Sequence, residues 1–145
     1  MKKSDMLHAL EHAKKVHQEQ MLKIEKLLEG KEVSSPTPLA KTECGCGEMF
    51  YDNQEEMIAI LGLQLFEKLD MYHSLWHVEY AKIYKIFFKE KRGLFSKMFK
   101  SKPTSLELDK AKMYRNELVQ ISNDLYHVSE TALRRVSALS ATKFK

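Results

Sequence analysis

The sequence predicts an all-α protein: an antiparallel bundle of about four helices with a cysteine-bearing loop after the first helix. Apolar side chains recur every three or four positions through most of the 145 residues, which is the period of an amphipathic helix, and no run alternates as a strand does. Only five glycines and three prolines punctuate the chain. Long helices joined by a few loops are therefore expected.

The first helix is expected between a capping residue at Ser4 or Asp5 and Gly30, which follows its last turn. The proline-rich stretch at 34–38 cannot continue this helix. Residues of about 31–52, which include both cysteines, are therefore expected to form a loop with one short helical turn at most. The apolar stripe of the helix includes a histidine and consists of Leu10, Ala13, His17, Met21, Ile24 and Leu28.

A second helical region is expected to start at Asp52 or Asn53, where Asn53 and Glu56 have the spacing of a capping box. Apolar and aromatic side chains keep the helical period from there to about residue 88. That length exceeds a typical globular helix, so a break is expected between Phe66 and Asp70.

Pro103 and the sequence Thr104-Ser-Leu-Glu107 indicate the start of a last helix over about 105–138. Its apolar stripe alternates steps of three and four, as the seam of a bundle or a coiled coil does. The stripe either faces the chain's own bundle or receives a partner helix, and a homodimer is expected. Its members are Ala111, Tyr114, Leu118, Ile121, Leu125, Val128, Ala132 and Val136.

Length and composition favour one domain over residues 1–145, with 43% apolar residues to form a single core. The formal charge of +4 is spread along the chain, which argues against a nucleic-acid partner. No stretch reaches the roughly 20 apolar residues of a membrane span, and the first residues do not have the pattern of a signal peptide. A cytoplasmic protein with reduced cysteines is expected.

Histidines and cysteines are placed so that they could meet at one metal ion. His73 and His77 are four residues apart and project from one face of a helix. His17 lies in the stripe of the first helix, and Cys44 would supply a thiolate, so one cysteine and three histidines can form a closed tetrahedral zinc site. Spacing alone leaves two ligands open, because His8, His12 or Cys46 could replace His17 or Cys44.

The same residues resemble a known family, the chemoreceptor zinc-binding (CZB) domain of bacterial chemotaxis receptors and diguanylate cyclases. In the loop, Cys44, Gly47 and Phe50 match the family motif, whereas Cys46 and Met49 stand where the family has Leu or Phe and Trp. The pair His73-x-x-x-His77 also matches, and the spacing of His17 and Gly30 reproduces that of an early helix whose Trp is replaced here by Gln20. The resemblance covers about residues 10–90.

The resemblance implies a ligand set of His17, Cys44, His73 and His77 around zinc, and a regulatory role in which zinc or an oxidant such as hypochlorous acid changes signalling output. Cys44 would then be the oxidisable ligand, and Cys46, two residues away, either captures the oxidised Cys44 or is a small loop residue. Methyl-accepting helices and a cyclase signature are absent from the sequence. A freestanding sensor that acts through a homodimer or a signalling partner is therefore expected.

Other classes of protein fit the sequence less well. Four protein ligands leave no open position on the metal, so an enzyme is not expected. A di-iron bundle would need repeated Glu-x-x-His pairs, and a thiol enzyme would need an oxyanion framework beside its cysteine. The main alternative is a helical interaction or membrane-surface module with a purely structural metal site. Its basic, aromatic stretch Lys89–Lys102 is more typical of a solvated connector.

Overall fold

The computed structural model describes residues 1–33, 36–88 and 103–145, apart from the side chain of Cys46. The prediction of an all-α bundle is confirmed, and Cys44 lies in the segment after the first helix. The stretch at 89–102, on which the membrane-surface alternative depends, lies outside the described residues. The helices are α1 (Lys3–Leu28), α2 (Gly45–Asp52), α3 (Gln54–Leu61), α4 (Leu63–Phe87) and α5 (Ser105–Ala138), followed by the 3-10 helix η1 (Ala141–Lys143).

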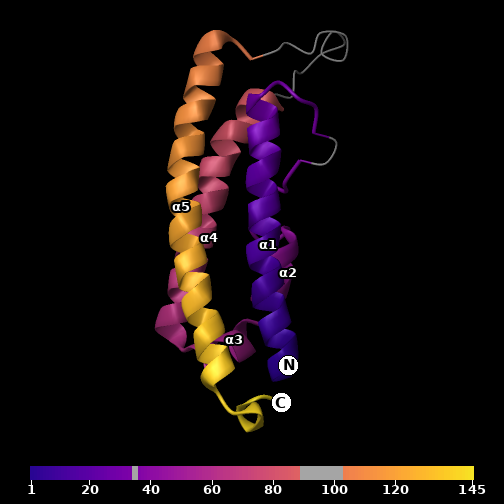
Figure 1. Cartoon of the computed structure of the whole chain (residues 1–145), viewed down its shortest axis with the longest axis vertical. Helices are drawn as coiled ribbons and strands as arrows, with labels where there is room; N and C mark the ends of the chain where they lie inside the picture. Colours follow the sequence, from indigo (N-terminus) through magenta and orange to yellow (C-terminus); the bar gives the residue numbers. More distant parts are fainter. Residues whose placement is uncertain (34–35, 89–102) are drawn as a thin grey trace.

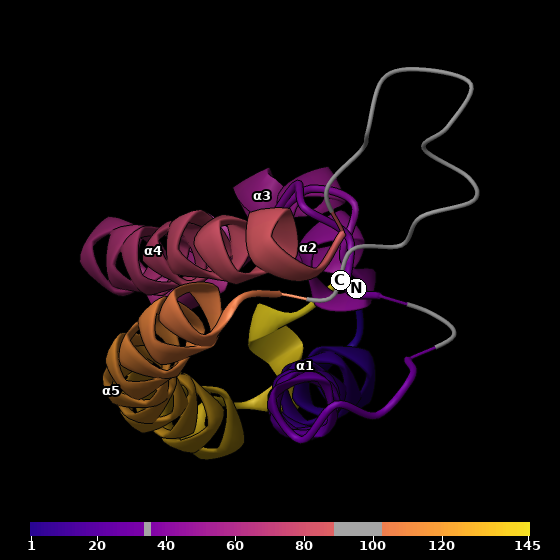
Figure 2. The same ribbon diagram turned by 90° about the horizontal axis from the view of Figure 1, so that it is seen from above.

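Three long helices form the body of the molecule, and the short helices α2 and α3 complete it (Figure 1). Helices α1 and α4 run in the same direction, and α5 runs opposite to both (Figure 1). Viewed from the end, α5 packs against both α4 and α1 (Figure 2). The short helix α2 lies beside the middle of α1, and α3 lies below it, where α4 begins (Figure 1). Cys44 is the N-cap residue of α2.

Buried apolar side chains form two clusters, and a more polar layer separates them. On α1, the buried His17 lies between Leu10 of one cluster and Ile24 of the other. On α5, the buried Ser122 lies between Leu125 of the first cluster and Leu118 of the second. One cluster contains Met6, Leu10, Phe50, Met57, Ile60, Leu61, Phe66, Leu69, Leu125, Val128, Ala132 and Val136. The other contains Ile24, Trp76, Tyr80, Ile83 and Leu118.

The second helical region breaks at Gly62, so the predicted break between Phe66 and Asp70 is wrong. Gly62 has a φ of 84°, a backbone conformation that glycine adopts without the clash of a Cβ atom. Helix α3 therefore ends at Leu61, and α4 runs without interruption from Leu63. Both ligand candidates on α4 consequently lie on one rigid helix.

The loop expected at about 31–52 contains more helix than predicted, because α2 occupies its last eight residues. The predicted capping box of Asn53 and Glu56 does not form at the start of α3. Asn53 instead turns back and donates from Nδ2 to the carbonyl of Met49 at 2.8 Å, which closes the end of α2. Helix α1 also begins earlier than predicted, with Lys2 at its N-cap.

The start of α5 is as predicted. The Thr104 hydroxyl accepts from the backbone of Glu107 at 3.1 Å, and the Glu107 carboxylate accepts from the backbone of Thr104 at 3.2 Å. The apolar stripe of α5 is buried or half-buried against the chain's own helices. The stripe thus faces the chain's own bundle, and a homodimer stays a prediction. None of the described helices is both long and apolar enough to span a membrane.

Candidate metal centre

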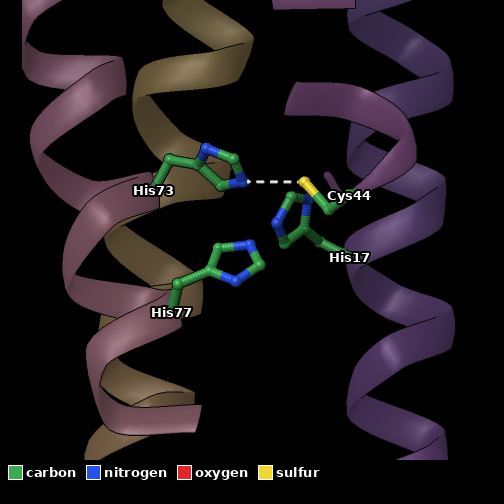
Figure 3. Close-up of side chains that lie close together, drawn as sticks. All are labelled: His17, Cys44, His73 and His77. Carbon is green, nitrogen blue, oxygen red and sulfur yellow. Dashed lines mark hydrogen bonds between the residues drawn. The ribbon is translucent and has the colours of Figure 1, made fainter. Parts of the chain in front are cut away.

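His17, Cys44, His73 and His77 converge in the middle of the bundle (Figure 3). Each offers one ligand atom, and these four atoms lie within 4.8 Å of one another. All four side chains are buried, none more than 6% exposed. In the described part of the chain, this is the one group of three or more histidine, cysteine and acidic side chains so arranged.

The two histidines of α4 share one face of the helix because they are four residues apart. His17 approaches them from α1, with its ring edge-on to that of His73 at 5.1 Å between centroids. The fully buried Trp76 packs against His17, and its indole nitrogen donates to the Ser122 hydroxyl on α5 at 3.0 Å. Packing of three long helices thus positions the three imidazoles.

Cys44 reaches the cluster as the N-cap residue of α2. Its Sγ accepts a hydrogen bond from the backbone of Gly47 at 3.2 Å and lies 3.2 Å from Nε2 of His73. Gly47 is required here, since a Cβ at this position would lie 1.7 Å from the carbonyl oxygen of Lys41. The pattern Cys-x-x-Gly therefore has a physical basis: the cysteine caps a helix whose third residue must lack a side chain.

Residues 36–53, here named the cysteine segment, are fixed to α4 by backbone carbonyls. The buried Tyr80 hydroxyl donates to the Thr37 carbonyl at 2.8 Å, and Nδ1 of His77 lies 3.0 Å from the Leu39 carbonyl. The Thr37 hydroxyl also donates a hydrogen bond to Oε1 of Gln20 on α1. Sequence reasoning missed these anchors, because a carbonyl is common to every residue type and carries no signature.

The hydrogen bonds select one tautomer for two of the histidines. Nδ1 of His17 lies 3.1 Å from the Ala13 carbonyl, and Nδ1 of His77 faces the Leu39 carbonyl. Carbonyls only accept, so each Nδ1 carries the proton and each Nε2 keeps its lone pair for a ligand. The Nε2 atom of His77 is buried without a hydrogen-bond partner. A buried acceptor left in this way is costly unless a cation completes it.

The electrostatics also suit a metal ion. Burial, reinforced by the neighbouring His73, lowers the pKa of His17 from 6.5 to about 4, so this imidazole is neutral at pH 7. Neutral imidazoles and a thiolate are the forms that bind zinc. A tetrahedral zinc shell spaces its nitrogen and sulfur ligands about 3.3–3.6 Å apart. The present separations, from 3.2 Å up to the 4.8 Å limit, require only small side-chain movements to reach that shell.

The structure leaves the alternative histidines outside the cluster. His8 and His12 are exposed on α1, where their rings stack at 6.2 Å, and His127 is exposed on α5. The four residues favoured by the sequence are the ones brought together, although as metal ligands they remain a prediction. The redox role expected for Cys46 concerns a side chain outside the described ones.

Searches against protein families, curated proteins and solved structures returned no match to this chain. The fold and the site therefore define its class: a helical protein with a buried cluster of three histidines and one cysteine that can hold a metal ion.

Proposed function

We propose that the chain is a zinc-binding regulatory domain in which His17, Cys44, His73 and His77 hold one zinc ion. The observation that carries the proposal is the convergence of four buried ligand atoms, one of which, Nε2 of His77, has no hydrogen-bond partner. When bound, zinc supplies the positive charge that compensates a desolvated thiolate. Imidazole and thiolate also accept copper, cobalt and nickel, and the tetrahedral arrangement together with cellular supply favours zinc.

Regulation is favoured over catalysis by the number of protein ligands. Four side chains fill a tetrahedral shell, which leaves no position for water or substrate. A site of this kind acts through the conformation that it stabilises.

The responding part, in this proposal, is the cysteine segment. Three ligands belong to long helices, whereas Cys44 caps an eight-residue helix. A two-electron oxidant such as hydrogen peroxide or hypochlorous acid converts a thiolate to a sulfenic acid, which removes the charge that Cys44 contributes. The resemblance to the chemoreceptor zinc-binding domain supports a sensory role of this type, with output through a second copy or a signalling partner.

Metal content of the untagged protein tests the binding step. Elemental mass spectrometry is expected to find about one zinc per chain, since one closed four-ligand shell is available. His73→Ala should retain far less zinc through purification, and His127→Ala, which changes an exposed histidine on α5, should retain as much as the wild type. A helical wild-type protein that contains no zinc and takes up none would overturn the proposal.

Hydrogen exchange tests the regulatory step. Addition of a chelator or of hydrogen peroxide to the zinc-loaded protein should increase amide exchange in residues 36–53 and change α4 and α5 far less. Equal changes in all helices would indicate a purely structural metal, which is the alternative reading of the site.

A further inference from the structure

We propose that Tyr51 and Asp70 are positioning residues of the metal centre, which together hold His73 in the tautomer that presents Nε2 to the metal. Lys41 attaches the same carboxylate to the cysteine segment. This inference rests on the proposed zinc site and adds to it a set of side chains that tune the affinity.

The geometry places these groups in one chain of hydrogen bonds. The Tyr51 hydroxyl, near the end of α2, donates to Oδ1 of Asp70 at 2.5 Å and lies 3.2 Å from Nδ1 of His73. Its ring stacks on that of His73, with centroids 6.0 Å apart and planes 22° from parallel. Asp70 and His73 are three residues apart on α4 and so share a face of the helix.

The direction of each hydrogen bond follows from proton counting. A phenol has one proton, and the Tyr51 hydroxyl gives it to the carboxylate of Asp70. The hydroxyl can then only accept from Nδ1 of His73, which leaves Nε2 without a proton and directed at Sγ of Cys44, 3.2 Å away. Tyr51 and Asp70 thus select the metal-binding tautomer by side-chain chemistry alone.

Asp70 is ionised for this role. Its partial burial on its own would raise the pKa, but hydrogen bonds from Lys41 and Tyr51 outweigh burial and hold the pKa below its usual value. A carboxylate that orients an imidazole in this way also strengthens the imidazole as a ligand.

His73 differs from the other two histidines in the kind of group that orients it. His17 and His77 face backbone carbonyls, which no substitution at those positions removes. His73 faces a side chain that is held by a second side chain, so the strength of its bond to a metal depends on residue identity. The metal centre is therefore tuned at His73.

Asp70 also secures the cysteine segment on both sides of Cys44. Lys41, three residues before Cys44, places Nζ 2.7 Å from Oδ1 of Asp70 and 2.7 Å from the Ser74 hydroxyl. Tyr51 follows Cys44 by seven residues and reaches the same oxygen. The side chains of Lys41 and Asp70 are 34% and 37% exposed, so this ion pair is expected to contribute less than the Tyr51 hydroxyl.

Zinc affinity measured by competition with a chromophoric chelator tests the inference. Tyr51→Phe retains the ring and removes the hydroxyl, and it should weaken zinc binding about 10- to 100-fold, the usual range for outer-shell partners. Asp70→Ala should weaken binding by a similar factor, and Asp70→Asn, which still accepts from Tyr51, should recover part of it. Tyr84→Phe, which removes a hydroxyl near the end of the same helix α4, is the matched control and should bind as wild type does.

A double-mutant cycle separates positioning from general stability. If Tyr51 acts chiefly through His73, Tyr51→Phe weakens the residual zinc affinity of His73→Ala much less than it weakens that of the wild type, because only its role in holding the cysteine segment remains. An additive loss in that background would overturn the inference, as would a Tyr51→Phe protein with wild-type affinity. In either case, zinc binding by the wild type and by Tyr84→Phe would show that the proposed zinc site still holds. Failure of the wild-type protein to bind zinc would overturn the zinc site and this inference together.

Discussion

Helix α4 and the cysteine segment bring ligands to the same point by different physical means. On α4, His73 and His77 occupy positions of a regular helical repeat, and the whole buried face of the helix holds them in place. The cysteine segment packs one buried phenyl ring, that of Phe50, against Phe66 in the core. Otherwise it is held largely by single hydrogen bonds, among them the Gly47 amide to Sγ of Cys44, the Tyr80 hydroxyl to the Thr37 carbonyl and the Lys41 ammonium to Asp70.

This difference indicates which attachment yields first. Moving a ligand on α4 disturbs the packing of a 25-residue helix with seven buried side chains, whereas moving Cys44 disturbs a helix of eight residues, the packing of Phe50 and a few hydrogen bonds. Bonds of this kind contribute about 0.5–1.5 kcal/mol each. The long helices, which carry the three histidines, are expected to define the ligand positions. The cysteine segment is expected to report whether the metal is bound.

The largest expected effect on zinc affinity is the loss of a ligand on α4. His77→Ala should weaken zinc binding by more than the roughly 100-fold upper range for outer-shell partners, because it removes a bond to the metal itself. Chelator competition measures the affinity, and circular dichroism measures the retained helix. Wild-type affinity in His77→Ala would exclude His77 as a ligand.

Acid should destabilise the metal-free protein through His17, the histidine on α1. The pKa of His17 is lowered to about 4 in the fold, so between pH 6.5 and 4 the unfolded chain binds a proton that the folded, metal-free chain does not. Stability of the metal-free protein should therefore fall as pH falls through this range, by about 3 kcal/mol at most. Urea unfolding at several pH values measures the slope.

Replacement of His17 checks this assignment. His17→Leu should flatten the pH dependence, whereas His8→Gln, at an exposed histidine of the same helix, should leave it unchanged. An equal slope in wild type and His17→Leu would assign the acid sensitivity to other groups.

A methyl group added to the cysteine segment should act locally. Gly47→Ala places a Cβ 1.7 Å from the Lys41 carbonyl, and such overpacking costs about 1–3 kcal/mol. Zinc affinity should fall about 10- to 100-fold while the far-ultraviolet circular dichroism stays close to wild type. Gly45→Ala is the matched control, because its added Cβ meets no atom within 4 Å. Equal affinities for the two variants would contradict the role given to Gly47.

The smallest expected effect comes from a single anchor of the segment. Tyr80→Phe removes the hydrogen bond to the Thr37 carbonyl, which should cost about 1 kcal/mol. Amide exchange should increase in residues 36–44, and zinc affinity should fall only a few-fold. Unchanged exchange there would show that Thr37 is held by its other contacts, among them the bond to Gln20.

The two ligands on α4 were predictable from the sequence, whereas the cysteine segment was predictable only in part. His73 and His77 follow from the helical period. The choice of His17 over His8 and His12 needed the resemblance to a known family. The structure agrees with this choice, because His17 is buried whereas His8 and His12 are exposed. The break at Gly62 was missed because the apolar period continues through it, although a glycine inside an apolar run was the available sign.

Helix α2 and the anchors of the cysteine segment could not be predicted for a different reason. The capping of α2 by Cys44 depends on a sulfur atom that accepts from Gly47, a role more often filled by Ser, Thr, Asp or Asn. The positions of Thr37 and Leu39 depend on backbone carbonyls that side chains distant in sequence select. Such tertiary bonds arise only after the helices have packed.

X-ray absorption at the zinc edge of the loaded protein tests the proposed ligand set, because it reports the identity of the atoms bound to the metal. One sulfur at about 2.3 Å and three nitrogens at about 2.0–2.1 Å are expected, with loss of the sulfur in Cys44→Ala. A shell of nitrogen and oxygen alone in the wild-type protein, or a shell with two sulfurs, would contradict the assignment of one cysteine and three histidines.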